Sequence, residues 1–107
     1  MLTIRFHPEK RNELGEVEIA PPYEIVAAYL QLDVQHNAAA AREVIAGLER
    51  VRSGQETHFV SDGNAYVVEA RDGTVHLSCE YDESVSLDVP IAWFIDALER
   101  WASFVAG

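Results

Sequence analysis

Apolar and polar residues alternate at the start of the chain. Residues 2–6 (Leu-Thr-Ile-Arg-Phe) follow the two-residue period of a half-buried strand, and residues 16–19 (Glu-Val-Glu-Ile) repeat it with both glutamates on one face. Pro21 and Pro22 should end the second strand, because proline has no N–H to donate to a neighbouring strand. The pattern therefore predicts two short N-terminal strands.

The hydrophobic period becomes helical from Tyr23 to about Arg52. Apolar residues recur there every three or four positions, as they do on the buried side of an amphipathic helix. Asp33 or Asn37 is suited to cap a break between two helices. Gly54 stands where a helix often ends on glycine.

Alternation returns in residues 56–88, which predict an antiparallel β-meander. The segment contains Asp62-Gly63 and Asp72-Gly73, pairs that suit two-residue hairpin turns because these turns need positive φ. With Asp72-Gly73 as the loop, Glu69 should face His76. The register puts the following residues on the core face: Tyr66, Val68, Val75, Leu77, Cys79 and Tyr81.

The last segment of the chain predicts an amphipathic helix. Pro90 suits the first helical position, where its missing N–H costs nothing. The apolar stripe is widened by Trp93, Ala97, Trp101 and Phe104 beyond the usual arc of about 100°. This width predicts either burial on two sides or a hydrophobic patch offered to a partner.

These elements together predict one α+β domain over residues 1–107: an antiparallel β-meander with a long central helical segment and a C-terminal helix packed on it. The expected core contains Leu32, Val44, Ile45, Leu48, Val68, Leu77, Leu87, Phe94, Ile95 and Leu98.

Charge narrows the classes of partner. Eighteen acidic residues face eight Lys and Arg, a net charge of −10 spread through segments that otherwise look folded. Such a field repels nucleic acid and anionic membrane surfaces and steers basic proteins toward the molecule. A single cysteine, Cys79, fits a reducing compartment, and no apolar run reaches the roughly 20 residues that span a bilayer. We therefore expect a soluble, cytoplasmic protein.

Few residues suggest catalysis or metal binding. His58, His76 and Glu69 are able to share the open sheet face, but their spacing matches no known ligand motif, and a half-exposed histidine paired across strands with Glu69 is the simpler interpretation. Cys79 lies on the predicted core face, which favours a buried structural thiol over a nucleophile. The sequence predicts no enzyme activity, no metal and no cofactor.

Several short matches accompany this layout: a helix ending near Arg52-Ser53-Gly54, the segment Gly63-Asn64-Ala65-Tyr66, the turn Asp72-Gly73, the pair Ser86-Leu87, and a final helix with Phe94 and Phe104. From Tyr23 onward the chain resembles the YacL-like family of small acidic bacterial proteins, which is similar in layout to immunity proteins of contact-dependent growth inhibition systems. The connection between Tyr81 and Ser86 looks shorter than in that family. The resemblance implies an α+β fold without catalytic residues, and an immunity role.

Three functions follow as hypotheses. The first is an immunity protein that neutralises a basic, nuclease-type toxin through an acidic surface. The second is a regulatory or adaptor protein that dimerises through Trp93 and Trp101, and the third is a metal-dependent enzyme using His58, His76 and Glu69. For the first, the expected partner-binding residues on the open face and edge of the meander are Glu69, His76, Glu80, Tyr81, Asp82, Glu83 and Asp88.

Overall fold

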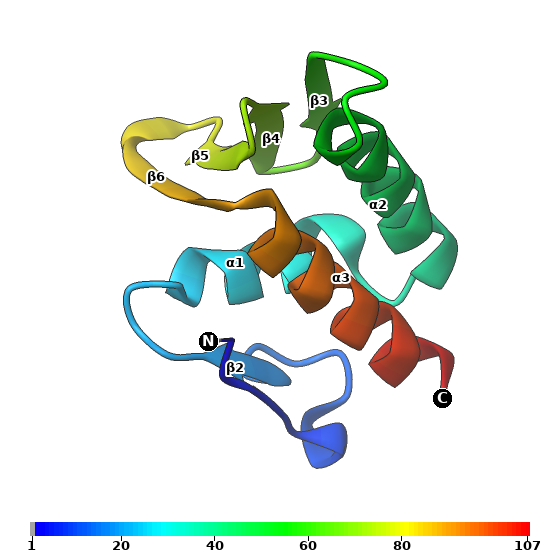
Figure 1. Ribbon diagram of the computed structural model, residues 1–107. Coiled ribbons are helices and arrows are strands. Elements are labelled where there is room, and N and C mark those ends of the chain that lie inside the picture. Colours follow the sequence, from blue (N-terminus) through cyan, green and yellow to red (C-terminus); the bar gives the residue numbers. More distant parts are fainter. Residues whose placement is uncertain (1) are drawn as a thin grey trace.

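Two antiparallel sheets lie on opposite sides of a layer of helices (Figure 1). The computed structural model describes residues 2–107. In chain order the elements are β1 (Ile4–Phe6), a 3-10 turn (Pro8–Lys10), β2 (Val17–Ile19), α1 (Glu24–Tyr29), a π-helical turn (Leu30–Val34), α2 (Ala38–Arg52), β3 (His58–Asp62), β4 (Tyr66–Arg71), β5 (Thr74–Cys79), β6 (Asp82–Pro90) and α3 (Ile91–Ala106). The predicted α+β fold with a C-terminal helix on a meander is confirmed.

The meander has the strand order β3-β4-β5-β6, and its central hairpin has the predicted register. Glu69 faces His76 and Val68 faces Leu77. The turn between them uses Asp72 at φ 53° and Gly73 at φ 80°, the left-handed backbone that the Asp-Gly pair predicts. Hydrophobic alternation and turn chemistry agree here, so the register follows from local sequence.

The prediction of a two-residue turn at Asp62-Gly63 is wrong. Strand β3 continues through Asp62, which pairs with Val67, and Gly63 does not take positive φ. The loop is instead shaped by a distant side chain, because Asp33 accepts hydrogen bonds from the N–H groups of Ala65 at 2.9 Å and Tyr66 at 2.9 Å. A tertiary contact has replaced the local turn preference.

The predicted central helical segment is interrupted by the π-helical turn. Asn37 caps α2 by accepting a hydrogen bond from Ala40 N at 3.0 Å, so the capping prediction holds for Asn37 and not for Asp33. Gly54, at φ 83°, follows the end of α2 as expected. Pro90 caps α3 from outside rather than occupying its first turn, which begins at Ile91.

Nine of the ten predicted core residues are buried or packed against the core. Leu32 is the error, since 43% of it is exposed. The π-helical turn explains this, because its wider turn shifts the apolar stripe so that Leu30 and Val34 face inward. Tyr81 was also expected on the core face, but β5 ends at Cys79 and Tyr81 lies in the next turn, where it is exposed.

The wide apolar face of α3 is buried on two sides. Trp101 is completely buried, and its indole N–H donates to the carbonyl of Gln35 at 2.7 Å. Its ring packs against Phe104 of the same helix, at a centroid distance of 5.7 Å, and against Phe6 of β1, at a centroid distance of 6.4 Å. Trp101 is therefore unavailable for the dimer contact considered above. Trp93 is partly buried against Tyr23, at a centroid distance of 4.8 Å.

Within residues 2–107, no helix combines the length and apolar character needed to cross a membrane.

Candidate functional site

The turn between β5 and β6 carries the densest run of acids in the chain and stands at one end of the sheet (Figure 1). Cys79 pairs with Asp82, which leaves Glu80 and Tyr81 as the turn. Glu80 N donates to the carbonyl of Ala65 at 2.8 Å, so this turn is tied to the neighbouring β3–β4 loop. Tyr81 is 81% exposed.

The strand after the turn begins with an irregularity that Asp82 stabilises. The register shifts between Ser78 and Cys79, so the start of β6 bulges away from regular pairing. The Asp82 carboxylate accepts hydrogen bonds from the hydroxyl of Ser84 at 2.6 Å and from its backbone N–H at 3.1 Å. These bonds lower the pKa of Asp82 below its usual value, because they favour the ionised carboxylate. Asp82 is therefore a fixed negative charge beside Tyr81.

Two further acids join this end of the sheet. The pKa of Glu80 is raised above its usual value, first by a hydrogen bond to the Asp62 carboxyl, then by burial and by the negative charges of Asp62 and Asp33. Asp62 and Asp33 are distant from Glu80 along the chain, so the sequence did not indicate that they belong to this group of acids. We call residues 80–83 with Asp33 and Asp62 the acidic hairpin.

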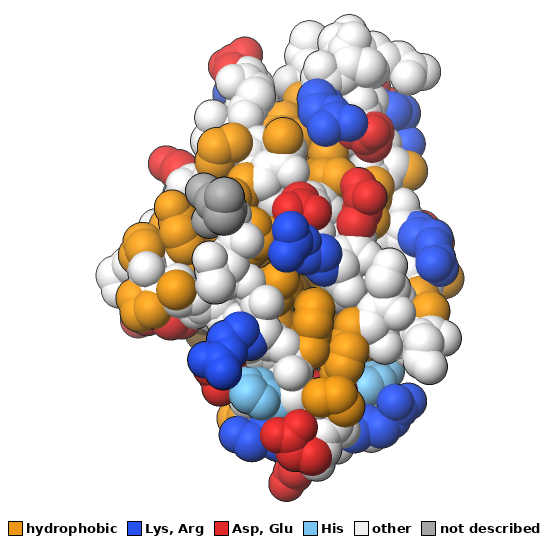
Figure 2. Space-filling view, turned by 60° about the horizontal axis from the view of Figure 1, so that its bottom comes forward, with side chains coloured by type: hydrophobic (Ala, Val, Ile, Leu, Met, Phe, Trp, Pro, Cys, Tyr) orange, Lys and Arg blue, Asp and Glu red, His pale blue; other side chains and the backbone are white. Residues whose placement is uncertain are grey.

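No basic side chain neutralises the acidic hairpin. Throughout residues 2–107, none of its carboxylates forms an ion pair with Lys, Arg or His. Basic residues gather elsewhere, and the face that carries the β1–β2 hairpin shows Lys and Arg interspersed with acids (Figure 2). The negative charge at the end of the meander is therefore uncompensated, whereas charge on the face in Figure 2 is mixed.

The other predicted partner-binding residues lie on the open sheet face and are paired within the protein. Glu69 Oε2 lies 2.8 Å from His58 Nε2 and 3.8 Å from an Arg71 guanidinium nitrogen. The hydrogen bond with His58 is the main cause that lowers the pKa of Glu69 below its usual value. His76 Nδ1 lies 2.6 Å from Asp88 Oδ1. The structure thus separates Glu69, His76 and Asp88 from the acidic hairpin.

These distances show which histidine is paired across strands with Glu69. His58, rather than His76, is the half-exposed histidine paired across strands with Glu69. Among the described residues 2–107, no group of three or more His, Cys, Asp or Glu side chains is arranged to hold a metal ion. Cys79 is a half-buried free thiol that packs against the core.

One acid was misplaced by the sequence analysis. Glu16 was expected to share a strand face with Glu18, but it precedes β2 and is 1% exposed, whereas Glu18 is exposed. Its carboxylate meets His36, 20 residues later, at 2.8 Å. Nothing in the local pattern distinguished Glu16 from a surface acid, because its surroundings come from α3 and the segment after the π-helical turn.

No protein-family model, curated protein or solved structure matches this chain in the comparisons made with each. The resemblance to the YacL-like family stays a prediction.

Proposed function

We propose that this protein is an immunity-type inhibitor that binds a basic, nuclease-type toxin through the acidic hairpin. The observation that carries the proposal is Tyr81, which is 81% exposed on a turn between Glu80 and Asp82. Among residues 2–107, no basic side chain forms an ion pair with either acid. The net charge of −10 supports the same conclusion, because it favours fast encounter with a positively charged partner.

The arrangement suits recognition of Arg and Lys. Nuclease toxins hold phosphate with basic side chains, and carboxylates form strong charge-assisted hydrogen bonds with the same groups. An exposed tyrosine among the acids supplies an aromatic anchor of the kind enriched at the centres of interfaces. Because Glu80 already experiences the charges of Asp62 and Asp33, a partner's cation would relieve repulsion at this point.

Association kinetics with a toxin domain encoded beside this protein would test the proposal. The double charge reversal Glu80→Lys/Asp82→Lys should slow association by about tenfold or more at low salt, since surface charge acts mainly on the association rate. The matched control is Glu43→Lys/Glu99→Lys, which changes net charge equally on exposed positions of α2 and α3. It should slow association by only about twofold.

Tyr81→Ala should act differently. It removes an anchor without changing charge, so the dissociation rate should rise by about tenfold while the association rate stays nearly constant. Equal effects of the two double reversals would place the recognition surface elsewhere. Absence of wild-type binding to the neighbouring toxin at any ionic strength would refute the immunity function.

A further inference from the structure

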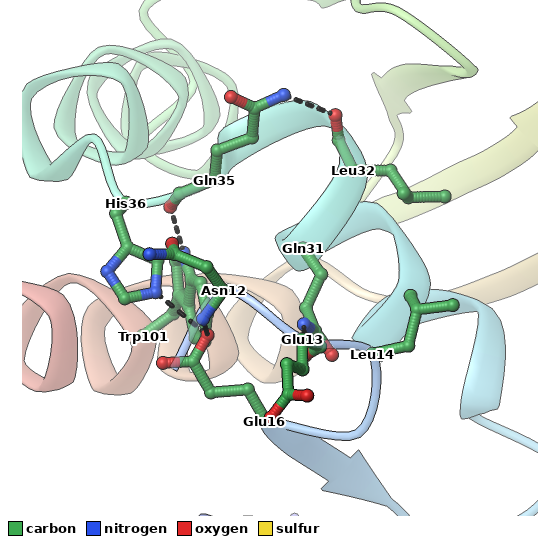
Figure 3. A pocket seen from close by; sticks show the side chains of 9 residues that line it. All are labelled: Asn12, Glu13, Leu14, Glu16, Gln31, Leu32, Gln35, His36 and Trp101. Carbon is green, nitrogen blue, oxygen red and sulfur yellow. Dashed lines mark hydrogen bonds and ion pairs between the residues drawn. The ribbon is translucent and has the colours of Figure 1, made fainter. Parts of the chain in front are cut away.

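A cavity of about 330 Å³ lies between the loop before β2, the segment around the π-helical turn, and Trp101 of α3 (Figure 3). Its volume falls near the lower end of the range for small-molecule pockets. Three separate parts of the chain build its walls, so it exists only in the folded protein. It is a different site from the acidic hairpin, and the inference below does not depend on the function proposed for that hairpin.

A buried carboxylate stands at one wall of this cavity. Glu16 Oε1 accepts hydrogen bonds from Asn12 N at 3.2 Å and meets His36 Nε2 at 2.8 Å. Glu16 Oε2 is also buried and has no hydrogen-bond partner within residues 2–107. A buried polar atom without a partner is rare and costly in folded proteins, so this oxygen calls for a donor.

Several donors that line the cavity are engaged by other groups, and within residues 2–107 none of them forms a hydrogen bond with Glu16 Oε2. The Trp101 indole N–H is used by the Gln35 carbonyl at 2.7 Å, and the Gln31 amide N–H group donates to the Glu13 carbonyl at 2.6 Å. The Glu13 side chain adds a second negative charge to the lining. Besides the Asn12 amide, the cavity lining therefore offers an unpartnered carboxylate oxygen and two acidic side chains.

The rim of the cavity is apolar. Leu14 is 76% exposed and Leu32 is 43% exposed, and both line the cavity on the side away from Trp101 and His36 (Figure 3). An alkyl chain can lie against the two leucines while a cationic head approaches Glu16.

The backbone around the cavity departs from regular geometry. The π-helical turn over residues 30–34 ends at Gln35, a non-glycine residue at φ 60°, and Asn12 on the opposite wall has φ 64°. Such turns and unusual φ values are found frequently at functional sites, where the surrounding structure holds them in place. These features favour a pocket with defined walls over a packing defect.

We propose that this cavity binds an organic cation: a guanidinium or primary ammonium group on a short alkyl stem. The cationic N–H groups reach the Glu16 carboxylate, Glu13 supplies a second negative charge, and the stem lies between Leu14 and Leu32. The cation is either a free small molecule or an Arg side chain of a peptide, since both present the same chemistry.

Nuclear magnetic resonance titration with agmatine tests the proposal. The Trp101 indole N–H signal should shift and saturate with half-saturation near about 1 mM or below. The Trp93 signal should stay unchanged, because Trp93 packs against Tyr23 and does not line the cavity. N-butylurea, which carries neither the guanidinium nor the ammonium group of agmatine, should bind at least about tenfold more weakly, since it has no positive charge. A second titration uses the peptide acetyl-Gly-Gly-Arg-Gly-Gly-amide. Tighter binding of agmatine would indicate a free small molecule, and tighter binding of the peptide would indicate an Arg side chain.

Three variants complete the test. Glu16→Gln should weaken agmatine binding about tenfold or more, and the matched control Glu43→Gln, on the exposed side of α2, should leave it unchanged. Because Glu16→Gln disturbs a buried site, Glu13→Gln provides a second test at an exposed position and should weaken binding about threefold. Failure of both cationic probes to move the Trp101 signal, equal binding of N-butylurea, or equal losses in Glu13→Gln and Glu43→Gln would overturn the proposal.

Discussion

The acidic hairpin and the Glu16 pocket use the same type of side chain in opposite ways. In the acidic hairpin, Asp82 and Glu83 are exposed carboxylates that form no ion pair with the basic side chains of the described part of the chain. Glu16 is 1% exposed and is held by Asn12 and His36. The hairpin carboxylates face solvent, whereas the Glu16 carboxylate lies inside the fold, where it also joins the N-terminal loop to the helices. The net charge of a sequence therefore says little about any single acid.

The aromatic residues repeat this contrast. Tyr81 marks the hairpin with 81% of its surface exposed, and Trp101 closes the base of the pocket without measurable exposure. The sequence left both roles open: Tyr81 was placed on the core face and also among the expected partner-binding residues, and Trp101 was expected either to be buried or to form a dimer contact. Burial decides which aromatic residue stabilises the fold and which is available for recognition.

The largest effect should separate the two aromatic residues. Trp101→Ala should lower the free energy of unfolding by about 3–5 kcal/mol, because it opens a cavity in the core and leaves the Gln35 carbonyl without its donor. Tyr81→Ala should change it by less than about 0.5 kcal/mol, since an exposed turn residue loses little on truncation. Urea denaturation of both variants measures the difference. Similar losses in the two variants would contradict the contrast.

A smaller effect should separate the two types of carboxylate. Glu16→Leu should reduce the free energy of unfolding by about 1–3 kcal/mol, because His36 Nε2 and Asn12 N lose their acceptor. Glu83→Leu should stay within about 0.5 kcal/mol of wild type, as it changes an exposed acid. Thermal melts by circular dichroism suffice for this comparison. A stable Glu16→Leu variant would show that Glu16 is not part of the structural support of the N-terminal loop.

The smallest effects are expected on the melting temperature, and they should have opposite signs for Glu80 in the acidic hairpin and Glu69 on the open sheet face. The pKa of Glu80 is raised, so its contribution to stability is present at low pH and is lost as pH rises through that pKa. Glu80→Gln should therefore raise the melting temperature slightly at about pH 7, and this gain should shrink toward about pH 4, where wild-type Glu80 is protonated.

Glu69→Gln should behave in the opposite way. The pKa of Glu69 is lowered by His58, so its contribution is present above the unfolded-state pKa and is lost as pH falls. The variant should melt slightly below wild type at about pH 7, and the difference should shrink in acid. Melting curves of the two variants over this pH range check both signs together. Shifts of the same sign would mean that Glu69 and Glu80 do not differ in their surroundings.

Local chemistry made much of the fold predictable. The Asp72-Gly73 turn and the alternation on both sides of it determine the register of β4 and β5, because a one-residue slip would expose Val68 and Leu77. The stripe of α3 likewise places Phe94 in the core. Predictions failed where a distant group intervened, as at Gly63, where the Asp33 carboxylate replaces the expected turn.

The candidate site was only partly predictable for the same reason. The run from Glu80 to Glu83 is contiguous, so its acidity is visible in the sequence. Asp62 and Asp33 join it through strand pairing and through the loop contact, which link residues far apart along the chain. Glu69, His76 and Asp88 were grouped with the acids by strand position alone. Side-chain pairing across the sheet then separated them from the acidic hairpin.

The sequence by itself determined the α+β fold class, the strand register of the central hairpin, the helical face of α3 and the large negative charge, because periodicity, turn preference and composition act over short distances. Only the tertiary structure decided which acid is buried, which carboxylates remain unpaired, which aromatic residue is exposed and where a cavity forms. Those properties depend on groups such as Glu16, His36 and Trp101, which lie far apart along the chain and meet only after folding.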